Sequence, residues 1–563
     1  MQGRLRLRLS ARTLWPGIVG CLAFHAASAA PLSPADHDAV RQQQQLLLDE
    51  SRRQREELER AVPVTRPSRP GLSVPASGTC FTVSSIVLEG ATLIDDRRQH
   101  RLLAPWLNQC LDMQRIHQLS NAVSDWYISR GYITSRAFLT EQNLRSGRLH
   151  LAVMEGRIEK FRMDGVPERT LKMTFPGLEG RILNLRDIEQ GMEQINRTRS
   201  TPVQIEILPA DRPGWSVVHL TATPEFPLSS SVSFDNSGQK STGVGQINAG
   251  LTGNNLLGLA DSWFVSGGRS SAFSDSKDAQ NFAAGFSVPY GYSLLDYSYS
   301  RNSYLSTIDY RGYAWRSRGD SETHRVNLSH VLFRNGNIKT GVSLGLNHRI
   351  NHNWLDDVLL ESSSRKLTSL LFGLNHTRKM SGGVATFNPT FSRGMPWLGA
   401  ESDGSKNGEL PKAQFRKWSF NASFQRPVAD NLWWLLSAYG QWSPDRLYGA
   451  EQLSIGGESS VRGFKEQYIS GNNGGYLRNE LNLPLFTLPY SGQVSAVAAV
   501  DGGWLQAEKD DPYSSGTLWG SAIGLSASAR HYSSQFTVGV PLKYPGWLAP
   551  DRLVLYYRIA LAF

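Results

Sequence analysis

The strongest constraint on this chain is an alternation of apolar and small polar side chains that recurs from Pro227 to Phe563. In Trp418–Gln425, for example, Trp, Phe, Ala and Phe alternate with Ser, Asn, Ser and Gln. Segments of about ten residues with this pattern, separated by turns rich in Asn, Gly and Asp, are typical of transmembrane β-barrels, whose strands face lipid on one side and an aqueous lumen on the other. At roughly 21 residues per strand and connection, the region predicts about 16 strands, and such barrels prefer an even number.

The last segment of the chain has the pattern expected of the strand that closes such a barrel. Alternate residues place an apolar stripe on one face, formed by Leu553, Leu555, Tyr557, Ile559, Leu561 and Phe563. We expect the last four of these residues to be the C-terminal barrel signal of an outer-membrane protein. A secreted β-sandwich is the alternative, but it would rarely keep so continuous an apolar face at its C-terminus.

The first 29 residues have the three parts of a secretory signal peptide. Four basic residues precede an apolar stretch, Leu14–Phe24, and a small-residue cleavage motif, Ala27–Ala29. Processing at Cys21 as a lipoprotein is the alternative, although the apolar run continues past that residue. The basic residues are Arg4, Arg6, Arg8 and Arg12, and their removal lowers the formal charge from +10 to +6 (10 − 4), which gives no reason to expect nucleic acid as a partner.

Three further segments separate the signal peptide from the predicted barrel (224–563). Residues 30–62 are a polar helix that Ser33 can cap, with Pro34 in its first turn and Asp36 as a capping-box acid. Its ~28 helical residues would be ~42 Å long, enough to cross a membrane inside an aqueous lumen, although a solvated tether is an open alternative. Residues 63–79 are a Pro-rich linker. Strand and helix patterns then alternate twice and predict two small α+β units, 80–163 and 164–223.

Cys80 and Cys110 are the two cysteines that remain once the signal peptide is removed. In an oxidising compartment, an isolated pair about thirty residues apart favours a disulfide. Two free buried thiols are the alternative. A zinc site is disfavoured because no histidine cluster accompanies the pair.

Motifs that resemble catalytic or metal sites have simpler explanations. The sequence around Ser343 matches a nucleophile elbow, but alternating Val and Leu residues place it in a strand rather than at a strand-to-helix turn. His348 and His352 are four residues apart, yet they lie among Asn and Asp and are expected to be solvated. The sequence has no phosphate-binding loop. We therefore expect no enzymatic activity, no catalytic residue, no metal and no cofactor.

One arginine needs an explanation in a barrel. Arg462 stands beside Gly463 and Phe464, and an arginine that faces lipid costs ~2–4 kcal/mol. If it lies in the lumen and is buried, it needs a carboxylate, ideally in bidentate geometry. Asp501, isolated among apolar and small residues of Ala496–Leu505, could be that partner. The alternative is that Arg462 lies in an external loop and Asp501 faces water.

The whole chain resembles the outer-membrane exporters of two-partner secretion, which belong to the Omp85 superfamily. These are the exporters of haemolysins, of filamentous haemagglutinin and of contact-dependent inhibition toxins. Val461–Phe464 (VRGF) is similar to the family's loop signature, and Ala499–Gly503 (AVDGG) to its partner motif, although Ala499 replaces the usual aromatic residue. The resemblance implies a 16-stranded barrel, two POTRA domains in the two α+β units, and a plug helix in residues 30–62.

The same resemblance implies the site residues and the function. Val461, Arg462, Gly463, Phe464, Asp501 and Gly503 would form a lock that anchors a loop folded into the lumen. The chain would then secrete one large unfolded β-helical exoprotein, recognised by the POTRA domains. Further expected partners are outer-membrane lipid and, during biogenesis, the barrel-assembly machinery and periplasmic chaperones, and we expect a monomer. An insertase of the same superfamily and a passive porin are the alternatives. The insertase is disfavoured because insertases commonly have more POTRA domains and lack a plug helix. The porin is disfavoured because a passive porin would lack the periplasmic modules.

Overall fold

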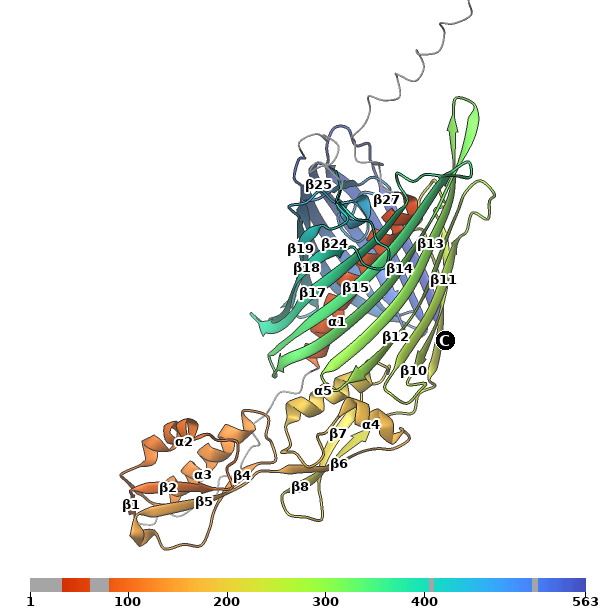
Figure 1. Cartoon of the computed structure of the whole chain (residues 1–563). Helices are drawn as coiled ribbons and strands as arrows, with labels where there is room; N and C mark the ends of the chain where they lie inside the picture. The colour runs from red at the N-terminus through yellow and green to blue at the C-terminus, as the bar shows by residue number, and fades with distance from the viewer. Residues whose placement is uncertain (1–32, 61–79, 405–409, 509–514) are drawn as a thin grey trace, which may run out of the picture.

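The computed structural model describes residues 33–60, 80–404, 410–508 and 515–563 (Figure 1). The predicted signal peptide and the linker 63–79 lie outside the described residues. The first described element is α1 (Pro34–Glu59), a helix of 26 residues. The Ser33 hydroxyl caps it by accepting a hydrogen bond from the backbone N of Asp36, at 3.1 Å. Among the described residues, no helix combines the length and apolar character needed to span a bilayer.

The first α+β unit has a three-stranded sheet in the order β2-β5-β4, with β2 and β5 parallel, and a separate two-stranded pair, β1 and β3. Its helix α3 buries Ile116, Leu119 and Val123, which recur at helical spacing, against the sheet. Its elements are β1 (Phe81–Val83), β2 (Ser85–Glu89), α2 (Asp96–Leu103), the 3-10 turn Ala104–Trp106, β3 (Gln109–Leu111), α3 (Met113–Ile128), β4 (Arg136–Leu139), the 3-10 turn Leu144–Ser146 and β5 (Arg148–Met154).

The second unit has a sheet in the order β6-β8-β7, covered by two helices. Its elements are β6 (Arg157–Met163), α4 (Glu168–Thr174), α5 (Leu185–Asn196), β7 (Gln204–Pro209) and β8 (Trp215–Thr221). The predicted boundary after Met163 is wrong, because β6 pairs with β8 and therefore belongs to the second unit. Only Glu155 and Gly156 separate β5 from β6. Both strands have an alternating pattern, and this pattern does not reveal which sheet each strand joins.

The remainder of the described chain forms a closed antiparallel barrel of 16 strands, as the sequence predicted. The last strand pairs with the first, from Arg558↔Asp235 to Ala562↔Ser231, and this pairing closes the barrel. The strands are β9 (Leu228–Asp235), β10 (Gln246–Asn254), β11 (Ser262–Ser270), β12 (Asp278–Tyr290), β13 (Ser293–Tyr310), β14 (Tyr313–Arg334), β15 (Ile338–Leu355), β17 (Arg365–Met380), β18 (Gly383–Met395), β19 (Arg416–Ala429), β20 (Leu432–Trp442), β23 (Gly474–Leu488), β24 (Gly492–Leu505), β25 (Gly516–Ser528), β26 (Tyr532–Lys543) and β27 (Val554–Ala562). A short strand, β16 (Val358–Leu359), pairs only with the end of β15.

The alternating pattern separates the two faces of the wall. On β19, Trp418 and Phe420 are exposed on the outside, whereas Asn421 and Ser423 are buried inside. The outward side chains of β27 include Leu555, Ile559 and Leu561. The lumen is therefore polar, and α1 runs through it (Figure 1). The two α+β units lie below one end of the barrel, called the near end here.

Candidate functional site: the lumen, its inward loop and its helix

A long connection between β20 and β23 folds back into the barrel. It contains a short antiparallel hairpin formed by β21 (Leu453–Ile455) and β22 (Ile469–Gly471), preceded by the 3-10 turn Gly449–Glu451. We call residues 443–473 the inward loop. An apolar cluster fixes it to the wall, comprising Leu453, Ile455, Val461, Phe464 and Ile469 of the loop and Tyr476, Leu505, Leu518 and Leu548 outside it.

The structure brings Arg462 and Asp501 together in a buried ion pair. The Nε of Arg462 donates to Oδ2 of Asp501 at 2.7 Å, and its Nη2 donates to Oδ1 at 2.7 Å. The backbone N of Arg462 donates to the same Oδ2 at 3.0 Å. Asp501 is 0% exposed and Arg462 5% exposed. Three hydrogen bonds to one carboxylate give the bidentate geometry that compensates for desolvating both charges.

A second carboxylate completes this ion pair, and the sequence reasoning missed it. Nη2 of Arg462 lies 3.2 Å from Oε1 of Glu480 on β23, and Arg478 also contacts that oxygen at 2.9 Å. Arg478 in turn donates to the backbone O of Glu458 in the inward loop at 3.0 Å. The signal was present in the sequence: Glu480 is an isolated acid at a lumen-facing position of a strand.

The loop tip approaches the wall so closely that only glycines fit. Gly463 has φ +97°, and a Cβ there would lie 2.5 Å from the backbone O of Val540. On the wall, a Cβ at Gly520 would lie 1.7 Å from the backbone O of Arg462, and one at Gly539 would lie 2.7 Å from the backbone N of Gly463. Because Gly520 pairs with Asp501 across β24 and β25, the wall is hollowed directly beside the ion pair.

The other predicted residues of the signature pack around this contact. Phe464 is fully buried and meets Tyr544 edge-on at 6.2 Å between ring centroids. Its backbone O accepts a hydrogen bond from the Tyr556 hydroxyl of β27 at 2.7 Å. A Cβ at Gly503 would lie 3.1 Å from Cγ2 of Val461, so the absence of a side chain at Gly503 leaves room for the Val461 side chain.

Helix α1 is held in the lumen by hydrogen bonds from several strands. Asn421 of β19 donates to the backbone O of Leu47 and to the Ser51 hydroxyl, both at 2.9 Å. Asn388 of β18 donates to Gln54 at 3.0 Å, and Arg55 is buried against Ser423. These contacts of α1 with the barrel wall are hydrogen bonds made by polar side chains.

The helix also contacts the inward loop. Gln44 donates to the backbone O of Ser454 at 2.7 Å and accepts from the Ser459 hydroxyl at 3.0 Å. His37 lies 4.5 Å from Tyr468 between ring centroids. Loop and helix therefore fill the lumen together.

A cluster of charges joins the helix, the barrel and the second α+β unit at the near end. Lys339 of β15 contacts Glu57 of α1 at 2.8 Å and also contacts Glu193 of α5. Arg334 of β14 contacts Glu193 at 3.1 Å and donates to Gln190 at 2.6 Å. Burial raises the pKa of Glu193, but the charges of Lys339 and Arg334 outweigh it and hold that pKa below its usual value.

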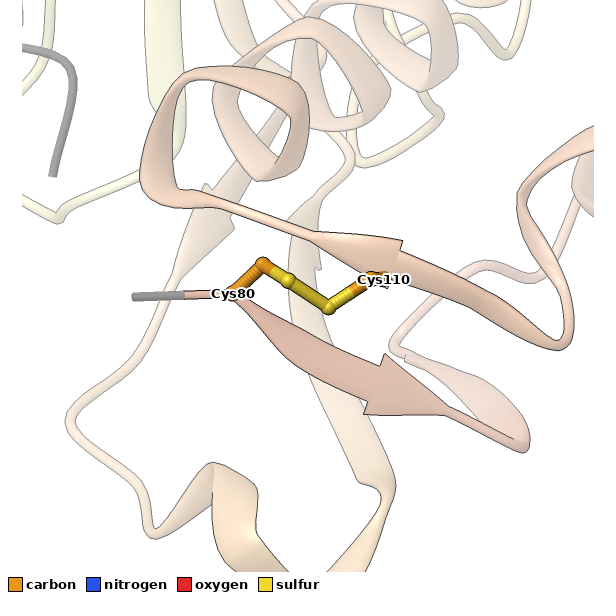
Figure 2. Close-up of a disulfide and its surroundings, with 2 residues drawn as sticks. All are labelled: Cys80 and Cys110. Atoms are coloured by element: carbon orange, nitrogen blue, oxygen red, sulfur yellow. A yellow bond between two sulfur atoms is a disulfide. The ribbon is translucent and has the colours of Figure 1, made fainter. Parts of the chain in front are cut away.

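Cys80 and Cys110 form a disulfide in the first α+β unit (Figure 2). Their Cα atoms lie 5.3 Å apart, and the bond joins the start of β1 to β3. This bond lies in the first α+β unit, outside the barrel lumen, and it stabilises the two-stranded pair of that unit. It has no part in the lumenal contacts described above.

The motifs set aside in the sequence lie in the barrel wall. Ser343 is in the middle of β15, between the outward-facing Val342 and Leu344. His348 bonds to Thr368 and His352 to Asp320. Within the described ranges, no group of three or more His, Cys, Asp or Glu side chains could hold a metal ion.

Comparison with known proteins places this architecture in a family. The family described as "Haemolysin secretion/activation protein ShlB/FhaC/HecB" matches residues 214–527, a ShlB-type POTRA domain matches 81–156, and a further POTRA domain matches 157–209. The chain is 65% identical over 545 residues to the outer membrane transporter CdiB of Escherichia coli, covering 96% of this chain and 93% of that protein. It is 49% identical over 552 residues to the outer membrane transporter CdiB of Dickeya dadantii (strain 3937), covering 97% and 99%.

A solved structure agrees with these relatives. The structure of CdiB from Escherichia coli matches with a TM-score of 0.92 at 66% identity, covering 95% of this chain and 100% of that one. The predicted family, barrel and POTRA domains are confirmed, as is the prediction of a transporter rather than an enzyme. The chain belongs to the haemolysin secretion/activation family ShlB/FhaC/HecB and is an outer-membrane transporter whose POTRA domains lie in the periplasm.

Proposed function

We propose that this transporter exports one large exoprotein of the contact-dependent inhibition type, unfolded, through the lumen that α1 now occupies. The high identity to transporters named CdiB favours that class of client over a haemolysin. Because no ATP is available in the periplasm, folding of the client outside would bias its movement outward. Among the expected partners, the exoprotein is the one this family works with.

The position of α1 is the observation that carries this proposal. A polar helix that is fixed mainly by side-chain hydrogen bonds exposes little apolar surface when it leaves, since Val40 and Leu58 are its buried apolar side chains. Each such bond has a net worth of only about 1 kcal/mol, so a client that makes comparable contacts can replace it. We therefore assign α1 the role of a plug that yields to the exoprotein.

The inward loop has the opposite character and would stay in place during export. Its tip combines a buried bidentate ion pair with an apolar cluster and close backbone contacts. Removing one partner of such a pair costs about 3–5 kcal/mol. We propose that Val461, Arg462, Gly463, Phe464, Asp501 and Gly503 form a permanent anchor, and that Glu480 is a further member.

The remaining partners follow from the surfaces of the molecule. The POTRA sheets have exposed edge strands, β7 in the second unit and β4 in the first, on which an extended client segment could add a strand. The closed barrel with its apolar outer face needs outer-membrane lipid. We further propose that the protein acts as a monomer and is inserted, with Tyr557, Ile559, Leu561 and Phe563 as its C-terminal signal, by the barrel-assembly machinery after periplasmic chaperones deliver it.

A secretion assay tests the proposal. The transporter is co-expressed with a candidate exoprotein of the contact-dependent inhibition type, and the amount of that protein at the cell surface and in the medium is measured. We expect export to require the transporter. Export that is unchanged when the transporter is deleted would refute the proposal.

A further inference from the structure

One hairpin of the barrel extends beyond its neighbours at the end opposite the POTRA domains. The periplasmic turns at Gly258 and Gly291 contact α4 and α5, so the turn between β13 and β14 lies on the extracellular side. This hairpin is visible as the tall green arm above the barrel rim (Figure 1). Its turn consists of Arg311 and Gly312, with φ +53° and +79°, the signature of a tight two-residue hairpin turn.

The tip of this hairpin, residues 306–316, is a two-stranded segment that projects beyond the neighbouring strands, and we call it the ribbon. β12 pairs with β13 only as far as Leu305, and β15 pairs with β14 only from Ser317 onward. The two strands of residues 306–316 therefore pair with each other and with no further strand of the described chain, although Asp356 bonds the backbone of Arg316. The β13 edge of the ribbon is open beyond the contact between Thr307 and the backbone O of Ser276.

The two faces of the ribbon differ sharply. The lumenal series of β13 contains Asn302 and Ser306, both buried, and continues at alternate positions to Ile308 and Tyr310. Their cross-strand partners are Trp315 and Tyr313. The exposed fractions of these four side chains are 51% for Ile308, 58% for Tyr310, 56% for Tyr313 and 37% for Trp315. The opposite face carries Thr307, Asp309, Ala314 and Arg316.

This apolar face is on the wrong side of the strand for lipid. The lipid-facing series of the same hairpin contains Leu295, Val326 and Leu328, and at the ribbon it becomes polar. By strand alternation, the aromatic face instead continues the face of β13 that lines the lumen, so it is on the side of the ribbon that a chain leaving the pore would pass. An isolated two-stranded ribbon with an unpaired edge and an uncovered apolar face is a template for an added strand.

We propose that the apolar face and open edge of the β13–β14 ribbon receive the exported polypeptide as it emerges. An extended segment would pair with the β13 edge near Ile308 and Tyr310 and cover the aromatic side chains with its own apolar residues. This would give the first strand of the client a surface on which to order before the client can form its own core. The inference rests on the proposed function, since the occupant is the exoprotein.

Site-specific photocrosslinking tests it. The partner exoprotein is fused at its C-terminus to a stably folded domain that cannot enter the pore, so that export stalls. A photoreactive phenylalanine derivative is placed at Tyr310, and a matched one at Asp309 on the polar face. We expect crosslinks to the stalled exoprotein from position 310 at roughly ten times the yield from 309, the ratio that corresponds to about 1.4 kcal/mol.

Substitutions give an independent readout. I308S/Y310S/W315S should lower the amount of wild-type exoprotein exported per unit time by roughly tenfold, whereas the control D309N/A314S should leave it unchanged. Equal yields from both faces, crosslinks only to a second copy of the transporter or to lipopolysaccharide, or full export by the triple variant would each overturn the proposal. Absence of export with the unaltered ribbon would instead refute the proposed function itself.

Discussion

Arg462 is a buried arginine whose position depends on the carboxylates that it contacts. An arginine on the lipid-facing side is costly, and a buried one needs a carboxylate, for which Asp501 was a candidate while an external loop remained the alternative. The structure adds what a sequence pattern does not contain, namely the third hydrogen bond from the Arg462 backbone and the second carboxylate of Glu480. Gly520 and Gly539 were also beyond prediction, because their importance depends on which strand the loop tip touches.

The ion pair should govern how often the inward loop detaches from the wall. Arg462→Ala leaves the buried carboxylate of Asp501 without its cation, which costs about 3–5 kcal/mol and raises the detached population more than about a hundredfold. Asp501→Ala should have a smaller effect, because Arg462 keeps its contact with Glu480. The measurement is the rate at which protease cuts residues 443–473 in the detergent-solubilised transporter. The double variant should be cut more slowly than Arg462→Ala, because Asp501 is no longer left unpaired and Glu480 keeps Arg478. Cutting rates equal to that of the unaltered protein would show that the pair does not hold the loop.

Gly463 should be sensitive to substitution for a different reason, because there is no room for a side chain beside the barrel wall. Gly463→Ala places a methyl group 2.5 Å from the backbone O of Val540, in addition to straining a positive φ. Gly457 is a matched control, because its φ is +129° and a Cβ there meets nothing within 4 Å. Both substitutions carry the backbone penalty of about 1–3 kcal/mol for a residue other than glycine at positive φ, so the excess effect at Gly463 measures the close contact. The same proteolysis assay should show clearly faster cutting for Gly463→Ala, and equal rates would contradict the tight packing of the tip.

Helices and strands could be predicted from the sequence where a helical or a strand periodicity continues over many residues. The polar helix 30–62 follows from its capping residues and composition, and the barrel from repeated alternation of period two. The boundary between the POTRA domains was placed one strand too late, since β5 and β6 have the same alternation and a two-residue connection. Nor could the sequence show that α1 lies inside the barrel, because polar helices are equally stable in bulk water.

Fixing α1 in the lumen should close the transporter. Ser51 and Asn421 bond at 2.9 Å, so cysteines at these two positions can be joined by a short bifunctional thiol reagent. Cys80 and Cys110 are already bridged and do not compete. We expect the joined protein to show few or no openings in planar-bilayer recordings, because the helix can no longer leave. The single variant Ser51→Cys treated with the same reagent is the control. Openings of normal size in the joined protein would mean that ions pass without displacing α1.

On the scale of the whole molecule, the three parts meet at Lys339. This lysine contacts one carboxylate of α1 and one of the second POTRA domain, so both carboxylates interact with the same charge. The residues that it joins lie 146 and 282 positions from it in the chain, so no local sequence pattern predicts the contact. It gives the periplasmic domains a direct contact with the element that fills the pore.

Replacing this charge should loosen the plug. Lys339→Met removes the cation that contacts Glu57 directly, while Arg334 still contacts Glu193. The expected result is an increase in the frequency of openings in planar bilayers, by roughly tenfold if one buried contact of about 1.4 kcal/mol is lost. Lys366, on the neighbouring strand and without a contact to α1 among the described interactions, provides the control Lys366→Met. Equal opening frequencies in the two variants would show that Lys339 does not hold the helix.

The central claim is that the exoprotein crosses through the space that α1 occupies, and crosslinking from the lumen wall tests it most directly. A photoreactive residue at Asn421 should join to α1 in cells without the exoprotein, because Asn421 bonds Leu47 and Ser51 there. In cells where the exoprotein is stalled during export, the account predicts that the same residue joins to the exoprotein and that its product with α1 is lost. Crosslinks to α1 that persist unchanged during export, with none to the exoprotein, would contradict it.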